Sequence, residues 1–195
     1  RASFLPGISR SLRSQLPDLR LHTFDISKGA VLEKGCVYLV QLKESLKLPK
    51  SISAAANPKS STGRLDVFTR LITEYADVFD YVEPEYQGAL YAEISPRSFS
   101  IKVSEGSKLN QIRFRHLAPA HEKYRSFALS DSELRQLHDA SPLVDGEPHI
   151  RHGLHVRVNL KGSAGSALIG YRAQQHTGVV DVNEVGKYPA RDFWD

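Results

Sequence analysis

The chain has 195 residues, which is enough for one domain of ordinary size or for one domain and part of another. Hydrophobic residues make up 41% and charged residues 25%, as in ordinary globular proteins, and no apolar stretch approaches the roughly 20 residues of a membrane-spanning helix. The net charge of +4 comes from scattered Lys and Arg residues. It fits a basic pocket for a small polyanion, whereas a nucleic-acid-binding face would be denser.

The chain contains one cysteine, Cys36, so no internal disulfide can form and nothing points to an oxidising compartment. Cys36 lies in the apolar run KGCVYLVQL, where we expect a buried small hydrophobic residue. No apolar signal-peptide core is visible near the start, and we therefore expect a cytoplasmic protein. The absence of methionine indicates a processed chain, a fragment or missing residues.

Short strands dominate the first part of the chain. Residues 1–20 are expected to form an irregular arm with one short helix, and HTFDISKGAVLEKGCVYLVQL contains two short apolar runs broken by turn residues. The apolar spacing of RLDVFTRLITEYADVF fits a helix in part, with a strand as the alternative. YVEPEYQGALYAEIS indicates a turn and a strand, and FSIKVSEGSKLNQIRFRHL indicates two strands around SEGS. This density of short strands favours a β sandwich or barrel.

A helix and a second set of strands follow. SDSELRQLHDA is expected to be a helix capped by Ser130 or Ser132, with Glu133 completing a capping box. The segments LHVRVNL, SALIGYRA and GVVDV are interpreted as strands of a second β unit.

The stretch NPKSSTGRL concentrates hydrogen-bond donors. Asn57 can cap a helix that begins at Pro58, which would place Ser60 and Arg64 four residues apart on one face. Together with Lys59 and backbone N–H groups, these side chains could cradle a phosphate. The alternative is a capped turn with solvated charges.

A carboxylate follows in the strand YAEIS. Glu93 has apolar neighbours, so partial desolvation would raise its pKa and suit it to general-base chemistry. The alternative is a carboxylate on the exposed face of an alternating strand. His149, His152 and His155 lack the Cys or carboxylate partners of a zinc site, so no metal ligands are predicted. A single cysteine also excludes the P-C-x-x-C motif of zinc-dependent deaminases.

Taken in order, NPKSSTGRL, VEPEYQGALYAEIS and VSEGSKLNQIRF resemble the dCTP deaminase branch of the dUTPase superfamily, in particular the long, two-half bacterial 2′-deoxycytidine 5′-triphosphate deaminases. The family motifs are S-S-x-x-R, then D-P-x-aromatic-x-G, then a Glu five residues after that Gly. The matching residues are Ser60, Ser61, Arg64, Glu83 in place of Asp, Pro84, Tyr86, Gly88 and Glu93.

The resemblance implies a mainly β fold, a dUTPase-like distorted β-barrel or jelly roll with a few short helices. It also implies hydrolysis of dCTP to dUTP and ammonia, in which Glu93 relays protons while water attacks C4 of cytosine, and Ser60 and Arg64 position the water, triphosphate or leaving group. The further substrate-binding residues are then Lys59, Ser61, Glu83, Tyr86 and Gln111. Mg²⁺ would bind through the triphosphate, and no zinc is needed.

The resemblance also divides the chain. Residues 1–30 are the arm, 31–128 a dUTPase-like deaminase domain, 129–152 a helix and loop linker, and 153–195 the start of a second dUTPase-like half. We expect residues to be missing after Asp195, because that half could not close. The superfamily predicts a homo-oligomer with a trimer-like arrangement of folds, binding dCTP or dUTP but neither nucleic acid nor membrane.

Three other functions remain open at this point. A dUTP pyrophosphatase, alone or in a bifunctional enzyme, would use Glu83 as its base. A non-catalytic nucleotide-binding regulator would bind nucleotide without turnover. A nucleic-acid-binding β domain is supported only by the basic charge, and it predicts salt-dependent DNA binding.

Overall fold

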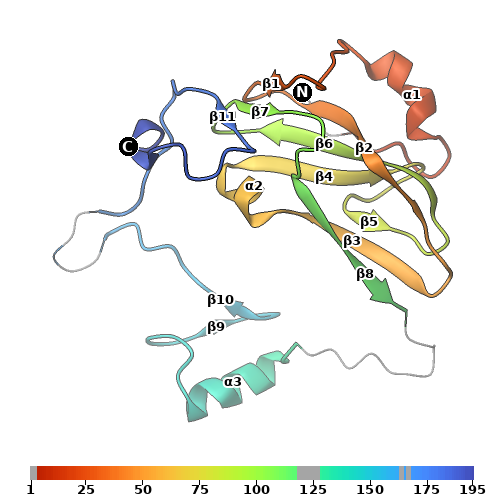
Figure 1. Cartoon of the computed structure of the whole chain (residues 1–195). Coiled ribbons are helices and arrows are strands. Elements are labelled where there is room, and N and C mark those ends of the chain that lie inside the picture. The colour runs from red at the N-terminus through yellow and green to blue at the C-terminus, as the bar shows by residue number, and fades with distance from the viewer. Residues whose placement is uncertain (1–3, 118–127, 163–164, 166–167) are drawn as a thin grey trace. The chain divides into compact units, whose positions relative to one another are not determined.

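Figure 1 shows a computed structural model of the chain, which describes residues 4–117, 128–162, 165 and 168–195. The chain divides into two compact units, residues 1–117 with 172–195, and residues 118–171. The prediction of a mainly β chain with a few short helices is confirmed. The described strands form separate sheets, and no closed barrel is found among them. Within the described parts, no helix combines the length and the apolar character needed to cross a membrane.

The first sheet of the larger unit has β6 (Gln87–Pro96) at its centre, between β2 (Tyr38–Lys47) and β4 (Val67–Thr73), and both pairings are antiparallel. β4 comes from the segment whose apolar spacing was ambiguous, and it is a strand. Hydrogen bonding to β6 over all seven of its residues decides this, from Val67 opposite Pro96 to Thr73 opposite Leu90. Cys36, just before β2, is half-buried rather than fully buried.

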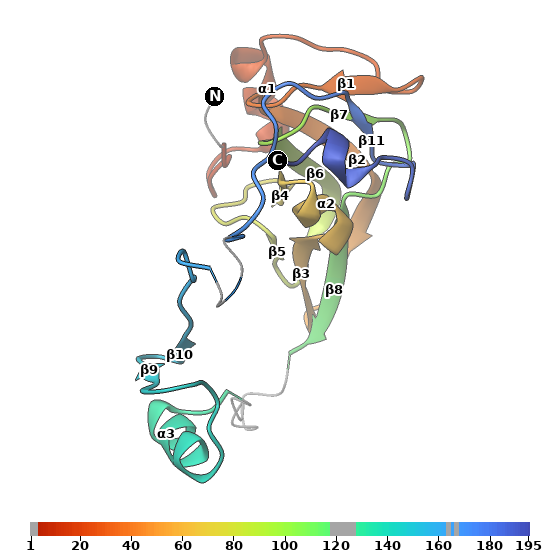
Figure 2. The same cartoon turned by 90° about the vertical axis from the view of Figure 1, so that its left-hand side faces the viewer.

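The second sheet has the order β5 (Tyr81–Val82), β3 (Ile52–Pro58), β8 (Asn110–His116). A single apolar cluster joins the two sheets. Leu71 and Leu90 of the first sheet pack in it with three buried residues of the second sheet, Ala54, Ala56 and Val82. The expected helix start at Asn57 and Pro58 is wrong. Both residues end β3, opposite Gln111 and Asn110, and α2 (Ser60–Arg64) begins after Lys59. Figure 2 shows β3 and β8 side by side, with α2 above them.

The third sheet combines strands from the two ends of the chain. β7 (Ile101–Val103) pairs antiparallel with β1 (Ala30–Leu32) and parallel with β11 (Val180–Asp181), so the C-terminal segment lies beside β7 in Figure 1. Phe193, just after the 3₁₀ helix η1 (Ala190–Asp192), is buried in the same core as Phe99 and Ile101. Residues 172–195 therefore complete the hydrophobic core of the larger unit.

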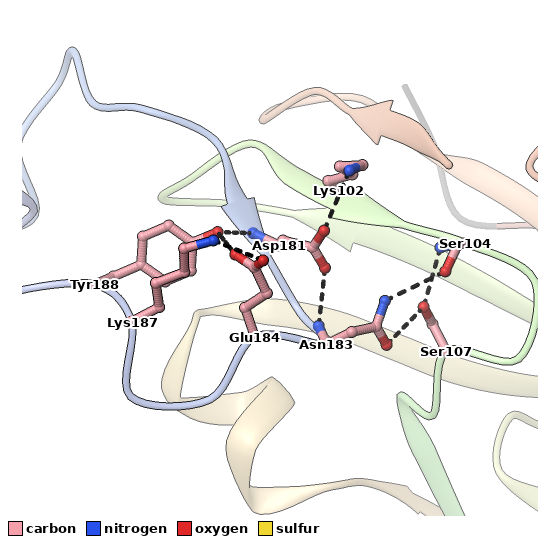
Figure 3. Close-up of polar contacts among 8 residues, drawn as sticks. All are labelled: Lys102, Ser104, Ser107, Asp181, Asn183, Glu184, Lys187 and Tyr188. Atoms are coloured by element: carbon pink, nitrogen blue, oxygen red, sulfur yellow. Dashed lines mark hydrogen bonds and ion pairs between the residues drawn. The ribbon is translucent and has the colours of Figure 1, made fainter. Parts of the chain in front are cut away.

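Polar contacts surround β11 (Figure 3). Asn183 accepts a hydrogen bond from Ser107 Oγ at 3.1 Å and donates one to Ser104 Oγ at 3.3 Å. Asp181 forms an ion pair with Lys102 at 3.3 Å. The Asn183 N–H, and next the Lys102 ammonium, lower the pKa of the Asp181 carboxyl. These contacts join the C-terminal segment to β7 and to the turn that follows it.

The smaller unit contains α3 (Asp131–Ala140) and a hairpin of β9 (His149–Ile150) and β10 (Leu154–His155). Ser130 and Glu133 form the predicted capping box. The carboxylate of Asp131 accepts hydrogen bonds from the backbone N–H groups of His152 and Gly153, which lower its pKa. Beyond His155, the described residues of LHVRVNL and SALIGYRA contain no strand, so those two predictions are largely wrong, whereas GVVDV contains β11.

The helix predicted in the N-terminal arm is α1 (Leu12–Leu19), capped by the Ser11 hydroxyl. Its fully buried Leu12 packs with Ile72 of β4 and Tyr91 of β6. This apolar cluster lies on the first sheet's face opposite the one that carries Leu71 and Leu90, because neighbouring residues of a strand point to opposite faces. The N-terminal arm thus covers one face of the sheet that contains Glu93.

Candidate active site

Glu93 occupies the central strand of the first sheet, opposite Leu39 of β2 and Arg70 of β4. Its side chain is 6% exposed, so the alternative of a solvated carboxylate is wrong. The side chain lies on the face that carries Tyr91, two residues earlier in the same strand. On that face, the backbone N–H of Phe4 donates a hydrogen bond of 3.0 Å to Glu93 Oε2.

A second carboxylate, that of Glu74, contacts both Tyr91 on this face and the start of α1. Glu74 Oε1 accepts a hydrogen bond from the Tyr91 hydroxyl at 2.9 Å, and Oε2 accepts one from the Arg13 N–H at 3.3 Å. Burial, and next the bond to Glu74, raise the pKa of the Tyr91 hydroxyl, which therefore stays protonated at neutral pH. Tyr91 and Glu74 thus hold α1 on the sheet, and the arm that reaches Glu93 is anchored there.

The donor-rich stretch is fixed at one buried point. Thr62 is buried, and its hydroxyl donates to the carbonyl of Leu109 at 3.0 Å, which also accepts the Lys59 N–H at 2.8 Å. Ser60, Ser61 and Arg64 are exposed, and Lys59 is half-buried. We call Lys59, Ser60, Ser61 and Arg64 the donor corner. Because the stretch is anchored through Thr62, the side chains of the donor corner remain accessible to a ligand from solvent.

The donor corner and Glu93 lie toward the same end of the β4–β6 pair. β4 begins three residues after Arg64, and its first residue, Val67, is opposite Pro96. Glu93 precedes Pro96 by three residues, which is about 10 Å along a strand. Glu93 and the start of β4, which follows the donor corner, therefore lie toward the same end of the first sheet.

Gln111 also lies near the donor corner. It is exposed on β8, opposite Asn57 of β3, two residues before Lys59. β8 begins directly after Leu109, whose carbonyl holds the start of α2. The pairing of β3 with β8 thus brings a side chain from a distant part of the sequence beside the corner.

Glu83 and Tyr86 lie elsewhere in the chain. Their turn precedes Gln87, the first residue of β6, so it is on the order of 20 Å along the strand from Glu93. Tyr86 donates from its hydroxyl to the Ala89 carbonyl at 2.5 Å, and burial raises its pKa. A Cβ on Gly88 would lie 2.9 Å from that hydroxyl, which explains the aromatic-x-Gly spacing. Glu83 is exposed. Within one chain, these two residues are not brought to Glu93.

A cavity of about 780 Å³ lies between the first two sheets and reaches Gln111. Residues of β2, β4, β6 and β8 line it together with residues 103–109, and the lining includes Thr69 and Asn110. The Thr69 hydroxyl and both amide atoms of Asn110 are buried and have no hydrogen-bond partner among the described residues. Sequence reasoning missed both residues, because a polar residue in an alternating strand is ordinarily assigned to the exposed face.

In the described ranges, no group of three or more His, Cys, Asp or Glu side chains is placed to hold a metal ion. His149 and His155 contact each other in the hairpin, with ring centroids 5.0 Å apart.

The chain resembles known proteins in both sequence and structure. The family model described as the 2′-deoxycytidine 5′-triphosphate deaminase (DCD) N-terminal domain matches residues 1–118, and the model of the C-terminal domain of the same family matches residues 130–195. No curated protein matches the chain. The crystal structure of 2′-deoxycytidine 5′-triphosphate deaminase from Agrobacterium tumefaciens is similar, with a TM-score of 0.77 and 48% sequence identity over 100% of this chain.

The chain spans 56% of the length of the Agrobacterium protein. The two family models together cover nearly all of the present sequence, including the donor corner, the central strand with Glu93 and the C-terminal segment that packs on β7. The chain therefore belongs to the 2′-deoxycytidine 5′-triphosphate deaminase family.

Proposed function

We propose that this chain carries the catalytic half of a dCTP deaminase, which hydrolyses dCTP to dUTP and ammonia. The observation that carries the proposal is the burial of Glu93 in the central strand of the domain that matches the family. A carboxylate in such a place is costly unless it is hydrogen-bonded, and an exposed position in the same strand would have been free of that cost. General-base chemistry gives a reason for the burial.

In the proposed reaction, water attacks C4 of the cytosine ring while the Glu93 carboxylate takes a proton from it. The same carboxyl delivers this proton to N3 of the ring. It then takes the proton of the new C4 hydroxyl and delivers it to the amino nitrogen, so ammonia leaves as the C4 carbonyl of uracil forms. Ser60 and Arg64, on the exposed side of α2, hold the water, the triphosphate or the leaving ammonia. One glutamate thus serves as base and then as acid, which balances the protons without a further group.

The donor corner would bind the triphosphate. Lys59 and Arg64 supply positive charge, Ser60 and Ser61 supply hydroxyl donors, and their exposure leaves them accessible to a nucleotide. Charged donors bind phosphate oxygens more strongly than neutral ones do. Magnesium would arrive with the nucleotide and neutralise phosphate charge, because Mg²⁺ keeps several waters and needs few protein ligands.

The position of the Glu83–Gly88 turn supports an oligomer. Glu83 and Tyr86 lie at the end of β6 away from the donor corner, so a second copy must supply the turn if these residues bind the same nucleotide. We therefore propose a homo-oligomer with a trimer-like arrangement. We also propose a cytoplasmic location, because the single cysteine gives no internal disulfide that would point to an oxidising compartment. Light scattering of the purified full-length chain checks the assembly, and a monomer with full activity would contradict it.

Separate incubations with dCTP and with dUTP test the function. Ammonia released from dCTP supports the deaminase, pyrophosphate released from dUTP indicates a dUTP pyrophosphatase, and both products indicate a bifunctional enzyme. Tight nucleotide binding without either product would support a regulator and overturn the proposal.

Replacing Arg64 with alanine is expected to raise the KM for dCTP about 10- to 100-fold, since a hydrogen bond to a charged group is worth about 1.5–3 kcal/mol. The matched control is Arg157→Ala, which removes an exposed arginine from the other unit. Steady-state kinetics of ammonia release measure both. Equal KM values for the two variants would remove Arg64 from the phosphate site.

A zinc-selective chelator is expected to leave the rate of ammonia release unchanged, since the chain lacks the P-C-x-x-C motif of zinc deaminases. Removal of magnesium is expected to weaken dCTP binding, because the triphosphate then keeps its full charge. Inactivation by the zinc chelator, reversed by added zinc and not by magnesium, would contradict the proposed mechanism.

A further inference from the structure

One contact to Glu93 comes from the N-terminal arm. The backbone N–H of Phe4 donates to Glu93 Oε2 at 3.0 Å, across 89 residues of sequence. A hydrogen bond from an N–H group to a carboxylate is stronger than one between neutral groups. A bond to one oxygen also restricts rotation of the carboxyl group, so the direction of Oε1 depends on the position of Phe4.

The donor is itself held in place. Phe4 and Leu5 pack against the apolar cluster that contains Tyr91 and Ile72. Gly7 lies three residues after Phe4, and its N–H donates a hydrogen bond of 2.8 Å to the Ala76 carbonyl. On the other side, the amide of Gln15 in α1 donates to the Pro6 carbonyl at 2.9 Å. Residues 4–7 are thus joined to both the sheet and α1, so the Phe4 N–H has a defined position.

We propose that the Phe4 backbone N–H is a positioning group of the active site, which orients the Glu93 carboxylate for proton transfer. The inference rests on the proposed function of Glu93. It makes the N-terminal arm part of the catalytic apparatus, through a backbone atom that no side-chain motif records. A 1 Å misplacement of a catalytic group can cost 100-fold in rate, so an orienting bond to the base has a measurable effect.

The opposite role is a cover, in which the arm blocks Glu93 and must move aside for the nucleotide. The two roles predict effects of opposite sign when the Phe4 hydrogen bond is removed. A positioning group predicts a lower kcat with a nearly unchanged KM, whereas a cover predicts faster turnover or a lower KM.

The test replaces the Phe4 N–H by an ester oxygen, through incorporation of phenyllactic acid at position 4 of the full chain. The control is the corresponding ester at Leu5, whose N–H has no hydrogen bond among the described residues. We expect kcat to fall about 10- to 100-fold for the ester at position 4, with KM within about 3-fold, and to change little for the control. Equal kcat values for the two esters, or a faster enzyme with the ester at position 4, would overturn the proposal.

A second pair of variants needs no synthetic residue. Phe4→Pro removes the N–H, and Phe4→Ala removes the ring but keeps the N–H. The positioning role requires Phe4→Pro to fall at least about 10-fold below Phe4→Ala in kcat. Hydrogen exchange at Gly7, which bonds to Ala76, shows whether the arm stays docked in both. With the arm docked, equal kcat values in these two variants would overturn the role.

A readout without catalysis separates this inference from the proposed function. In the wild-type protein, the Phe4 amide proton is expected to be protected from hydrogen exchange, and Glu93→Ala is expected to speed its exchange at least about 10-fold while Gly7 keeps its protection. Unchanged exchange at Phe4 in that variant would overturn the contact itself. A protected Phe4 in an enzyme that releases no ammonia from dCTP would instead overturn the proposed function, and the catalytic role of the contact with it.

Discussion

Replacing Glu93 with glutamine is expected to lower the rate of ammonia release from dCTP by about 10²–10⁴, because the amide cannot take a proton from water. The upper end is expected, since the same group also returns the proton to the leaving nitrogen. The amide oxygen can still accept the Phe4 N–H, so the arm stays on the sheet. Binding of dCTP is expected to persist, because in the proposed site the triphosphate is held by the donor corner, at and before α2, and not by Glu93.

Two measurements are needed for this variant. Ammonia release gives the rate, and isothermal titration gives the affinity for dCTP. Glu147→Gln is the control, as Glu147 is an exposed carboxylate of the other unit. Turnover by Glu93→Gln at a rate near that of the control would exclude the proposed general base, and loss of dCTP binding together with activity would place Glu93 in binding instead.

Local patterns predicted the elements whose signals are local. The helix over 131–140 has its capping box within four residues, and the strands around SEGS lie on either side of a turn rich in Ser and Gly. The donor motif and Glu93 could also be proposed from the sequence, because their spacing is fixed along the chain. Pairing between distant strands brings Gln111 to the same region, which only the family resemblance anticipated.

Where sequence reasoning failed, a distant part of the chain decides the structure. Asn57 and Pro58 form a good helix-capping pair, but β8 pairs with them and extends the strand to Pro58. The alternating pattern of LHVRVNL forms no long strand, because only two of its residues pair with β9. The Phe4 contact to Glu93 uses a backbone N–H, which every residue except proline possesses, so no residue type could have indicated it.

The C-terminal segment is the clearest case of such distant pairing. Residues 172–195 belong to the region matched by the C-terminal family model, yet they pack with residues 1–117. Val180 N–H donates to the Ser100 carbonyl at 3.0 Å, and Val182 N–H donates to the Lys102 carbonyl at 3.1 Å. The second family region therefore contributes backbone hydrogen bonds and core to the unit that contains Glu93, so the first region is not structurally complete without it.

Replacing Phe193 with alanine is accordingly expected to lower the free energy of unfolding of the larger unit by about 3–5 kcal/mol, the usual cost of truncating a buried phenylalanine. Phe193 is 8% exposed, and its ring meets Phe99 and Tyr188 edge-on, with centroids 5.5 Å and 5.8 Å apart. Since domains are stable by only about 5–15 kcal/mol, this loss is a large part of the total.

Urea unfolding of the full chain, monitored by the fluorescence of its single tryptophan, measures the change. Trp194 reports on this core because its ring packs edge-on against Phe99. Val185→Ala is the control: Val185 is in the same segment but 96% exposed, and its truncation is expected to change stability by less than about 0.5 kcal/mol. If Phe193→Ala unfolded at the same urea concentration as Val185→Ala, the segment could not be part of this core. We expect instead that only Phe193→Ala loses stability and that its deaminase activity is lower at temperatures where the wild-type protein is folded. The catalytic unit would then require the second family region for its structure.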